Sequence, residues 1–160
     1  MNKKIKVIRD LSLVEKELSS AQGGVISITL QKDSFAQFAT IFVYQNKNIF
    51  FYLENEELLR TIKLDSPAKF TILNNKSVTK ELIKKKELIE KKEPLYRLFS
   101  IVVTGVIREV EEKKTIRDID QSFIEKYSGK LLLSEKETQT KGKLLVVDSE
   151  ELLAYDELGF

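Results

Sequence analysis

The sequence predicts a mainly β protein of the α+β class, in which helices flank an antiparallel sheet. Two observations lead to this expectation. Residues 24–73 contain three apolar strands in succession, a short helix and a fourth strand, with only short polar breaks between them. Residues 26–31 alternate, with Ile26, Ile28 and Leu30 on one face and polar side chains on the other. A period of two is typical of a half-buried antiparallel strand.

The N-terminal part is predicted as an edge segment followed by a helix. Residues 3–8 carry Ile5, Val7 and Ile8 as anchors. A helix then begins at Asp10 or Ser12, either of which can cap it. Residues 12–15 (SLVE) match the capping box, in which a serine and a glutamate accept hydrogen bonds from backbone N–H groups of the first turn. The helix ends before the two glycines at 23 and 24, which suit a sharp entry into the next strand.

The central elements follow from apolar runs and turn residues. Residues 35–44 are almost wholly apolar, which predicts a strand covered on both faces, and residues 49–53 return as an aromatic strand after a turn at 45–48. Asn55 can cap the short helix that follows. This helix ends before Pro67, because a residue preceding proline avoids the α region, and residues 68–73 form a strand.

The last part of the chain predicts one amphipathic helix, one long strand, a second helix and two C-terminal strands. Residues 74–94 are rich in lysine and are interrupted by glutamates, so a solvated helix is favoured over a nucleic-acid surface. Further predictions, in order, are a strand over 95–112 with Gly105 inside it, a helix over 115–127 closed by Gly129, a polar loop over 134–143, a strand over 143–148 and a short strand over 152–155.

The composition of the chain excludes several classes of function. The chain has 160 residues, which fits one domain, and no apolar run near the length of a membrane span. Its net charge of +2 predicts no attraction to nucleic acid or to an anionic membrane. No apolar segment follows the basic first residues, so a cytoplasmic protein is expected. The chain has no cysteine and no histidine, which removes thiolate nucleophiles, the usual general base and the usual haem ligand.

The order of elements over residues 24–73 resembles the core of the FMN-binding split β-barrel family, the pyridoxamine 5′-phosphate oxidase-like proteins. The long strand with a glycine inside it and the N-terminal helix are also similar to the family. The resemblance implies a six-stranded antiparallel split barrel with flanking helices, with residues 1–160 as a single FMN-binding domain. It further implies a homodimer whose two sites lie at the subunit interface and bind a small-molecule ligand.

The resemblance also implies a set of site residues. The isoalloxazine ring would contact residues on the second and third strands, namely Gln37, Phe38, Ala39, Thr40 and Leu53. The phosphate would contact Arg60, Thr61 and Lys63, with Ser100 from the partner. Arg60 is the strongest candidate, because a guanidinium can bind phosphate oxygens bidentately. No metal site is expected, since Asp118, Asp120 and Glu125 do not share one helix face.

The chain departs from the family at two places. Residues 35–44 lack the arginine and lysine that the oxidases carry on the second strand. Glu54, Glu56 and Glu57 stand where those enzymes have hydroxyl and basic residues, and carboxylates beside a helix N-terminus repel phosphate. Oxidation of pyridoxamine phosphate is therefore not expected. Arg60, Thr61 and Lys63 are equally compatible with the exposed face of a short helix.

Three functions remain. The first is an FMN-binding flavoprotein, a flavin-dependent oxidoreductase of unknown substrate, because flavin chemistry needs neither histidine nor cysteine. The second is a split-barrel dimer that has lost its flavin and binds a ligand or a protein, which the acidic residues favour. The third is a haem-binding relative, which would have to use tyrosine as its haem ligand or bind haem without a protein ligand.

Overall fold

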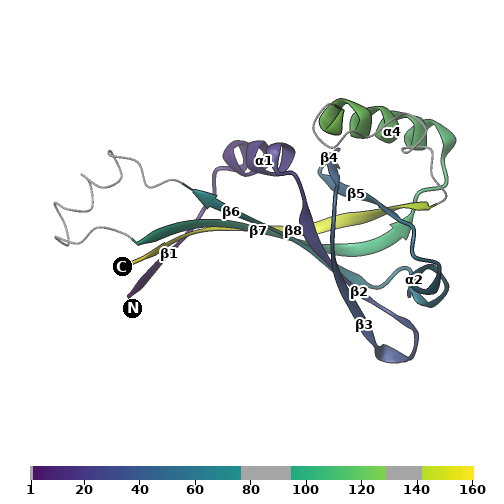
Figure 1. The fold of residues 1–160 in the computed structure, drawn as a ribbon, viewed down its shortest axis with the longest axis horizontal. Coiled ribbons are helices and arrows are strands. Elements are labelled where there is room, and N and C mark those ends of the chain that lie inside the picture. The colour runs from purple at the N-terminus through teal and green to yellow at the C-terminus, as the bar shows by residue number, and fades with distance from the viewer. Residues whose placement is uncertain (1, 77–94, 129–141) are drawn as a thin grey trace. The chain divides into compact units, whose positions relative to one another are not determined.

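The computed structural model describes residues 2–76, 95–128 and 142–160. In chain order its elements are β1 (Lys3–Val7), α1 (Leu11–Ser20), β2 (Gly24–Thr29), a 3₁₀ turn (Gln31–Asp33), β3 (Phe35–Thr40), β4 (Val43–Gln45), β5 (Asn48–Leu53), α2 (Glu56–Thr61), β6 (Pro67–Lys76), β7 (Tyr96–Glu109), α4 (Lys113–Tyr127) and β8 (Lys143–Gly159) (Figure 1). None of the helices in these ranges is long and apolar enough to cross a membrane.

The predicted fold class, a mainly antiparallel β structure with flanking helices, is confirmed. The strands form one sheet in the order β3-β2-β6-β7-β8-β5-β4, and β1 pairs with β8. Within the described ranges the sheet has eight strands, where six were predicted. The predicted second strand is interrupted at Ile41 and Phe42, and the two expected C-terminal strands are one continuous strand, β8. The predictions for residues 77–94, for Gly129 and for most of the 134–143 loop lie outside the described residues.

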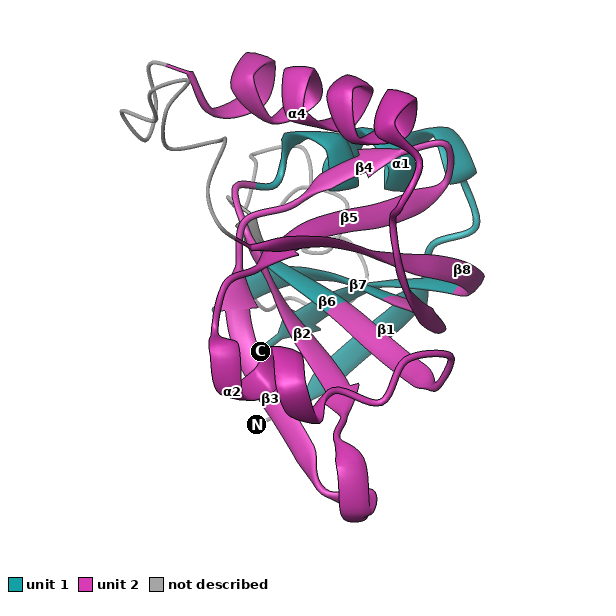
Figure 2. Ribbon diagram, turned by 90° about the vertical axis from the view of Figure 1, so that its right-hand side faces the viewer, with its two compact units in different colours: residues 1–21, 71–102, 152–160 teal, residues 22–70, 103–151 magenta. Residues whose placement is uncertain are grey.

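The chain divides into two compact units, coloured separately in Figure 2. Unit 1 comprises residues 1–21, 71–102 and 152–160, and unit 2 comprises residues 22–70 and 103–151. Strands β6, β7 and β8 contribute residues to both.

In unit 1, β1 pairs antiparallel with the end of β8, from Lys3 opposite Gly159 to Val7 opposite Tyr155. Ile5 and Val7 are 61% and 45% exposed, so their predicted role as anchors is wrong: pairing along the backbone holds this strand. The cap of α1 is Asp10, whose carboxylate accepts from the Leu13 N–H at 3.3 Å. The capping-box interpretation with Ser12 is therefore wrong.

In unit 2, β2 and β3 form a hairpin in which Ser27 lies opposite Gln37 and Thr29 opposite Phe35. Ile26 and Ile28 are buried, as the alternation predicts. The prediction that residues 35–44 are covered on both faces is wrong for β3. Its odd-numbered residues are exposed, because β3 is the last strand of the sheet order and shows one face to solvent.

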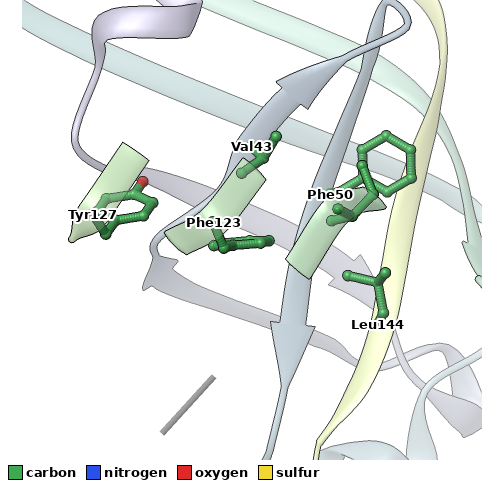
Figure 3. Close-up of a cluster of buried hydrophobic side chains, with 6 residues drawn as sticks. Val43, Phe50, Phe123, Tyr127 and Leu144 are labelled. Atoms are coloured by element: carbon green, nitrogen blue, oxygen red, sulfur yellow. The ribbon is translucent and has the colours of Figure 1, made fainter. Parts of the chain in front are cut away.

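Strands β4 and β5 form a second hairpin, which α4 covers (Figure 1). Asn46 and Lys47 both have positive φ, which suits the tight turn between twisted strands. The cluster between α4 and the strands consists of Val43, Phe50, Ile119, Phe123, Tyr127 and Leu144 (Figure 3). Because α4 packs on one face of β5, Phe50 is buried on that face. Its neighbours Ile49 and Phe51 are buried on the opposite face, so β5 is covered on both sides.

Tyr127 links α4 to the corner between β3 and β4. Its ring is fully buried, and its hydroxyl lies 2.9 Å and 3.0 Å from the carbonyl oxygens of Phe42 and Gln22. The same hydroxyl accepts from the Phe42 N–H at 3.1 Å. Burial raises the pKa of Tyr127, so the neutral phenol that can donate is maintained. The strand predicted over residues 35–44 is therefore interrupted at Ile41 and Phe42, where the Tyr127 hydroxyl forms hydrogen bonds with the backbone of Phe42.

Candidate functional site

The outer face of β3 is the first part of the candidate site. Strand β3 pairs with β2 along one side and ends the sheet order, so it is an edge strand. The side chains of Gln37 and Ala39 are exposed on this face. An edge strand offers backbone N–H and C=O groups to a ligand, and a small side chain such as that of Ala39 lets a flat ring approach.

The other predicted ring contacts are placed differently. Phe38 points to Phe51, with ring centroids 6.5 Å apart, and Leu53 is 3% exposed. The Thr40 hydroxyl donates to the Ile41 carbonyl at 3.0 Å. Of the five predicted ring contacts, the structure therefore leaves the side chains of Gln37 and Ala39 open, whereas Phe38 and Leu53 belong to packing inside unit 2.

Helix α2 provides the predicted phosphate ligands. Asn55 caps it by accepting from the Leu58 N–H at 2.9 Å, as predicted. Arg60 and Lys63 are exposed near its end, and the Lys63 N–H donates to the Thr29 carbonyl at 3.0 Å, which ties this end to β2. The Thr61 hydroxyl donates to the Glu57 carbonyl at 2.8 Å within the helix.

The acidic residues of α2 share a side with Arg60. Glu56 and Glu57 are exposed in the first turn and lie four and three residues before Arg60. Residues at these spacings are neighbours on a helix surface. The positive potential that Arg60 offers to an anion is therefore reduced by two nearby carboxylates. Ser100, the last predicted contact, lies on the part of β7 that belongs to unit 1.

An open depression, which the sequence did not reveal, lies on the outer face of the sheet in unit 2. Its volume is about 200 Å³, and its lining residues are Ser27, Ile28, Thr29, Phe35, Pro67, Ala68, Lys69 and Thr104. Ser27 and Gln37 are paired across β2 and β3, so the depression adjoins the β3 face. The only sequence signal was indirect: the polar face of residues 26–31 carries hydroxyls and not charges.

Asp120 and Tyr52 form a second polar feature, away from these residues. The Tyr52 hydroxyl donates to the Asp120 carboxylate, and its ring lies 5.4 Å from the Phe123 ring. Burial raises the pKa of Asp120. A raised carboxyl pKa can mark a catalytic acid. Here both partners lie where α4 packs on β5, so the pair is explained by the joining of these two elements.

Comparisons with known proteins establish the fold. No protein-family model matches the sequence, and no curated protein is similar to it in sequence. Among solved structures, the FAD-binding protein of Mycobacterium smegmatis is similar with a TM-score of 0.63 and 16% identity, covering 97% of this chain and 99% of that chain. A candidate pyridoxamine 5′-phosphate oxidase of Corynebacterium glutamicum has a TM-score of 0.62 and 14% identity over 100% and 98% of the two chains.

A third similar structure is the haem storage protein of Vibrio cholerae. Its TM-score is 0.63 at 11% identity, and the likeness covers 91% of this chain and 94% of that chain. At such identities the three structures show a common fold. Their ligands differ, so the fold by itself does not name the cofactor.

Proposed function

We propose that this chain, which has the fold of the pyridoxamine 5′-phosphate oxidase-like split barrels, is an FMN-binding flavoprotein and a flavin-dependent oxidoreductase. The observation that carries the proposal is the edge strand β3, on which Gln37 and Ala39 are exposed; the resemblance to the family would put the ring against this strand. When bound, a flavin supplies hydride or electron transfer, and the protein contributes binding and orientation.

The residues present fit a flavin in two respects. The Gln37 amide can donate to and accept from the polar edge of the ring, while Ala39 leaves room for its plane. Arg60 and Lys63 are exposed cations at the end of α2, and both can bind phosphate oxygens. Phe38, Thr40 and Leu53 would contribute through their backbone groups, since their side chains are engaged elsewhere.

An absorbance titration with FMN tests this proposal. We expect flavin bands that shift on binding, and we expect Arg60→Ala to weaken FMN binding about tenfold, because a charge-assisted hydrogen bond to phosphate is lost. The matched control is Arg117→Ala, since Arg117 is an exposed arginine on α4 of the same unit. Absence of binding at saturating FMN would overturn the flavoprotein proposal.

The acidic residues of α2 provide an independent prediction. We expect the double variant Glu56→Gln with Glu57→Gln to bind FMN about fivefold more tightly than the unmodified chain, because two charges that repel phosphate are removed. Glu111→Gln with Glu112→Gln is the control, since both glutamates are exposed and precede α4. Equal affinity in the α2 double variant and the unmodified chain would place the phosphate away from α2. Added salt should weaken FMN binding more in this double variant than in the unmodified chain, because the net positive charge beside the phosphate is then larger.

The alternative is a split-barrel binding module that has lost its flavin. Glu54, Glu56 and Glu57 favour it, because they stand where the family carries phosphate ligands. A colourless protein that stays colourless with FMN would support this alternative. Haem binding is a less favoured function, because the chain has no histidine; a Soret band after addition of haemin would support it.

The proposal includes a homodimer with the site at the subunit interface. Its support is the exposed aromatic Phe35, which is 78% accessible on the β3 face of a single chain. Light scattering coupled to size exclusion would measure the mass, and a monomer at all concentrations would contradict the dimer.

A further inference from the structure

Strand β1 is an exposed margin of the sheet in unit 1. It pairs antiparallel with β8 along one side, from Lys3 opposite Gly159 to Val7 opposite Tyr155. Within residues 2–76, 95–128 and 142–160, no strand pairs with its other side. All 5 residues of β1 are exposed, and none of them is a proline or a glycine. The backbone of β1 is therefore suited to pairing with a further strand.

The hydrogen bonds at the two ends of β1 show which backbone groups are open. The Phe160 N–H donates to the Asn2 carbonyl and the Ile8 N–H donates to the Ala154 carbonyl, both at 2.9 Å. In an antiparallel ladder, residues that bond to one neighbouring strand alternate with residues that bond to the other side. The even-numbered residues of 2–8 therefore bond towards β8. The N–H and C=O groups that point away from β8 belong to Lys3, Ile5 and Val7.

The side chains of β1 form two rows of different chemistry. Successive side chains of a strand point to opposite faces of the sheet. Ile5 and Val7 share one face, where they are 61% and 45% exposed. Lys4 and Lys6 share the other face and form a basic row. A strand that pairs with β1 would therefore meet apolar side chains on one face and ammonium groups on the other.

The strand opposite β1 does not neutralise this basic row. Asp156 of β8 lies opposite Lys6. Its carboxylate accepts two hydrogen bonds from the Arg97 guanidinium, at 2.8 and 3.0 Å, so it is already paired. Lys6 forms no ion pair with a described residue. The charge of Lys6 is therefore open to a binding partner.

A second copy of β1 does not suit this edge. An antiparallel copy would have to align the open backbone groups of both strands, so odd-numbered residues would pair with odd-numbered residues. A lysine of the basic row, Lys4 or Lys6, would then stand directly opposite a lysine of the copy. Like charges in this position destabilise a sheet, whereas opposite charges stabilise it. The basic row therefore favours an acidic strand.

We infer that the open edge of β1 binds an extended acidic peptide by strand addition. The peptide backbone would bond to the open N–H and C=O groups of β1. Its acidic side chains would lie beside Lys4 and Lys6, and its apolar side chains would cover Ile5 and Val7 on the opposite face. The recognised sequence is therefore one in which acidic and apolar residues alternate. None of the residues assigned to the flavin lies on β1.

The probe is the peptide EVEVEVE, acetylated and amidated at its ends and titrated into the full chain without flavin. Hydrogen exchange followed by NMR should show fast exchange at the amides of Ile5 and Val7 in the free chain and slow exchange with the peptide bound. The amides of Lys4 and Lys6 should be protected in both states, because they bond towards β8. The control peptides are KVKVKVK, of opposite charge, and EEEVVVE, which has the same composition without alternation. Neither should protect β1.

Ile5→Pro tests the backbone pairing. It removes an N–H that points away from β8, so β1 should stay paired with β8 while the peptide no longer binds. The matched control is Ile5→Ala, which shortens the same side chain and keeps the N–H, and this variant should still bind the peptide.

Lys6→Gln tests the charge. We expect it to weaken peptide binding about two- to fivefold, the range for an exposed ion pair. Lys114→Gln, at an exposed lysine in the first turn of α4, should leave peptide binding unchanged.

Several results would overturn the inference. Protection of the Ile5 and Val7 amides in the free chain would mean that another segment or a second copy already covers the edge. Equal binding of either control peptide, or unchanged binding to Ile5→Pro, would exclude recognition by strand addition. Absence of saturable binding would mean that the lysines of β1 serve only to keep other strands away. Because no flavin is present, each of these results leaves the FMN titration independent.

Discussion

Phe123→Ala is expected to lower the free energy of unfolding by about 4 kcal/mol. Phe123 is 2% exposed and lies at the centre of the cluster that joins α4 to β4 and β5 (Figure 3). Its ring lies 5.4 Å from that of Tyr52 and 6.0 Å from that of Tyr127. Truncation removes this contact area and leaves a cavity between two elements that can collapse only in part.

Urea unfolding followed by far-UV circular dichroism measures this change, since the chain has no tryptophan. The control is Leu95→Ala, a truncation to the same residue at an apolar side chain that is 72% exposed. We expect this control to change stability by no more than about 0.5 kcal/mol. A loss below about 1 kcal/mol for Phe123→Ala would mean that this cluster does not hold α4.

Gly105→Ala is expected to destabilise the protein by about 3 kcal/mol. A Cβ at position 105 would lie 2.0 Å from the carbonyl oxygen of Asp148 and 2.7 Å from its carbonyl carbon. Both contacts are to the backbone of β8, so no side-chain rotation can relieve them. Strands β7 and β8 would have to separate at this point, at the cost of local pairing.

Gly23→Ala is the matched control, because its Cβ would approach the Thr40 carbonyl oxygen only to 3.2 Å. We expect a loss of less than about 1 kcal/mol there, measured by the same urea titration. If both alanine variants are equally stable, the close approach of β7 and β8 at Gly105 is not rigid. The sequence predicts a long strand with Gly105 inside it, and the structure shows that β7 needs this glycine for its close approach to the backbone of β8.

Local chemistry made several elements predictable. Asn55 was recognisable as a cap because its carboxamide can accept from the N–H three residues on, and the structure has this bond. Ile26 and Ile28 were recognisable as buried because alternation is a property of the strand itself. The cap of α1 was ambiguous, since Asp10 and Ser12 both have suitable side chains and the choice depends on the backbone entering the helix.

The candidate site was predictable in part. Position in the chain was enough to place Gln37 and Ala39 on a strand and Arg60 and Lys63 near the end of a helix. The orientation of Phe38 towards Phe51, and the burial of Leu53, depend on which strands meet inside unit 2. The depression depends on residues from β2, β3, β6 and β7, so no local pattern could reveal it.

The sequence by itself determined the fold class, most element positions, the absence of histidine and cysteine chemistry, and the acidic character of the helix that would meet a phosphate. Only the tertiary structure decided that residues 35–44 are divided between β3, which has one exposed face, and β4, which has none. The tertiary structure also decided that the Tyr127 hydroxyl bonds to the backbone between these strands, and that Lys69 lines an open depression. The physical reason is range. Caps, turns and alternation act within a few residues, whereas burial, close approach and uncompensated charge depend on residues brought together from distant parts of the chain.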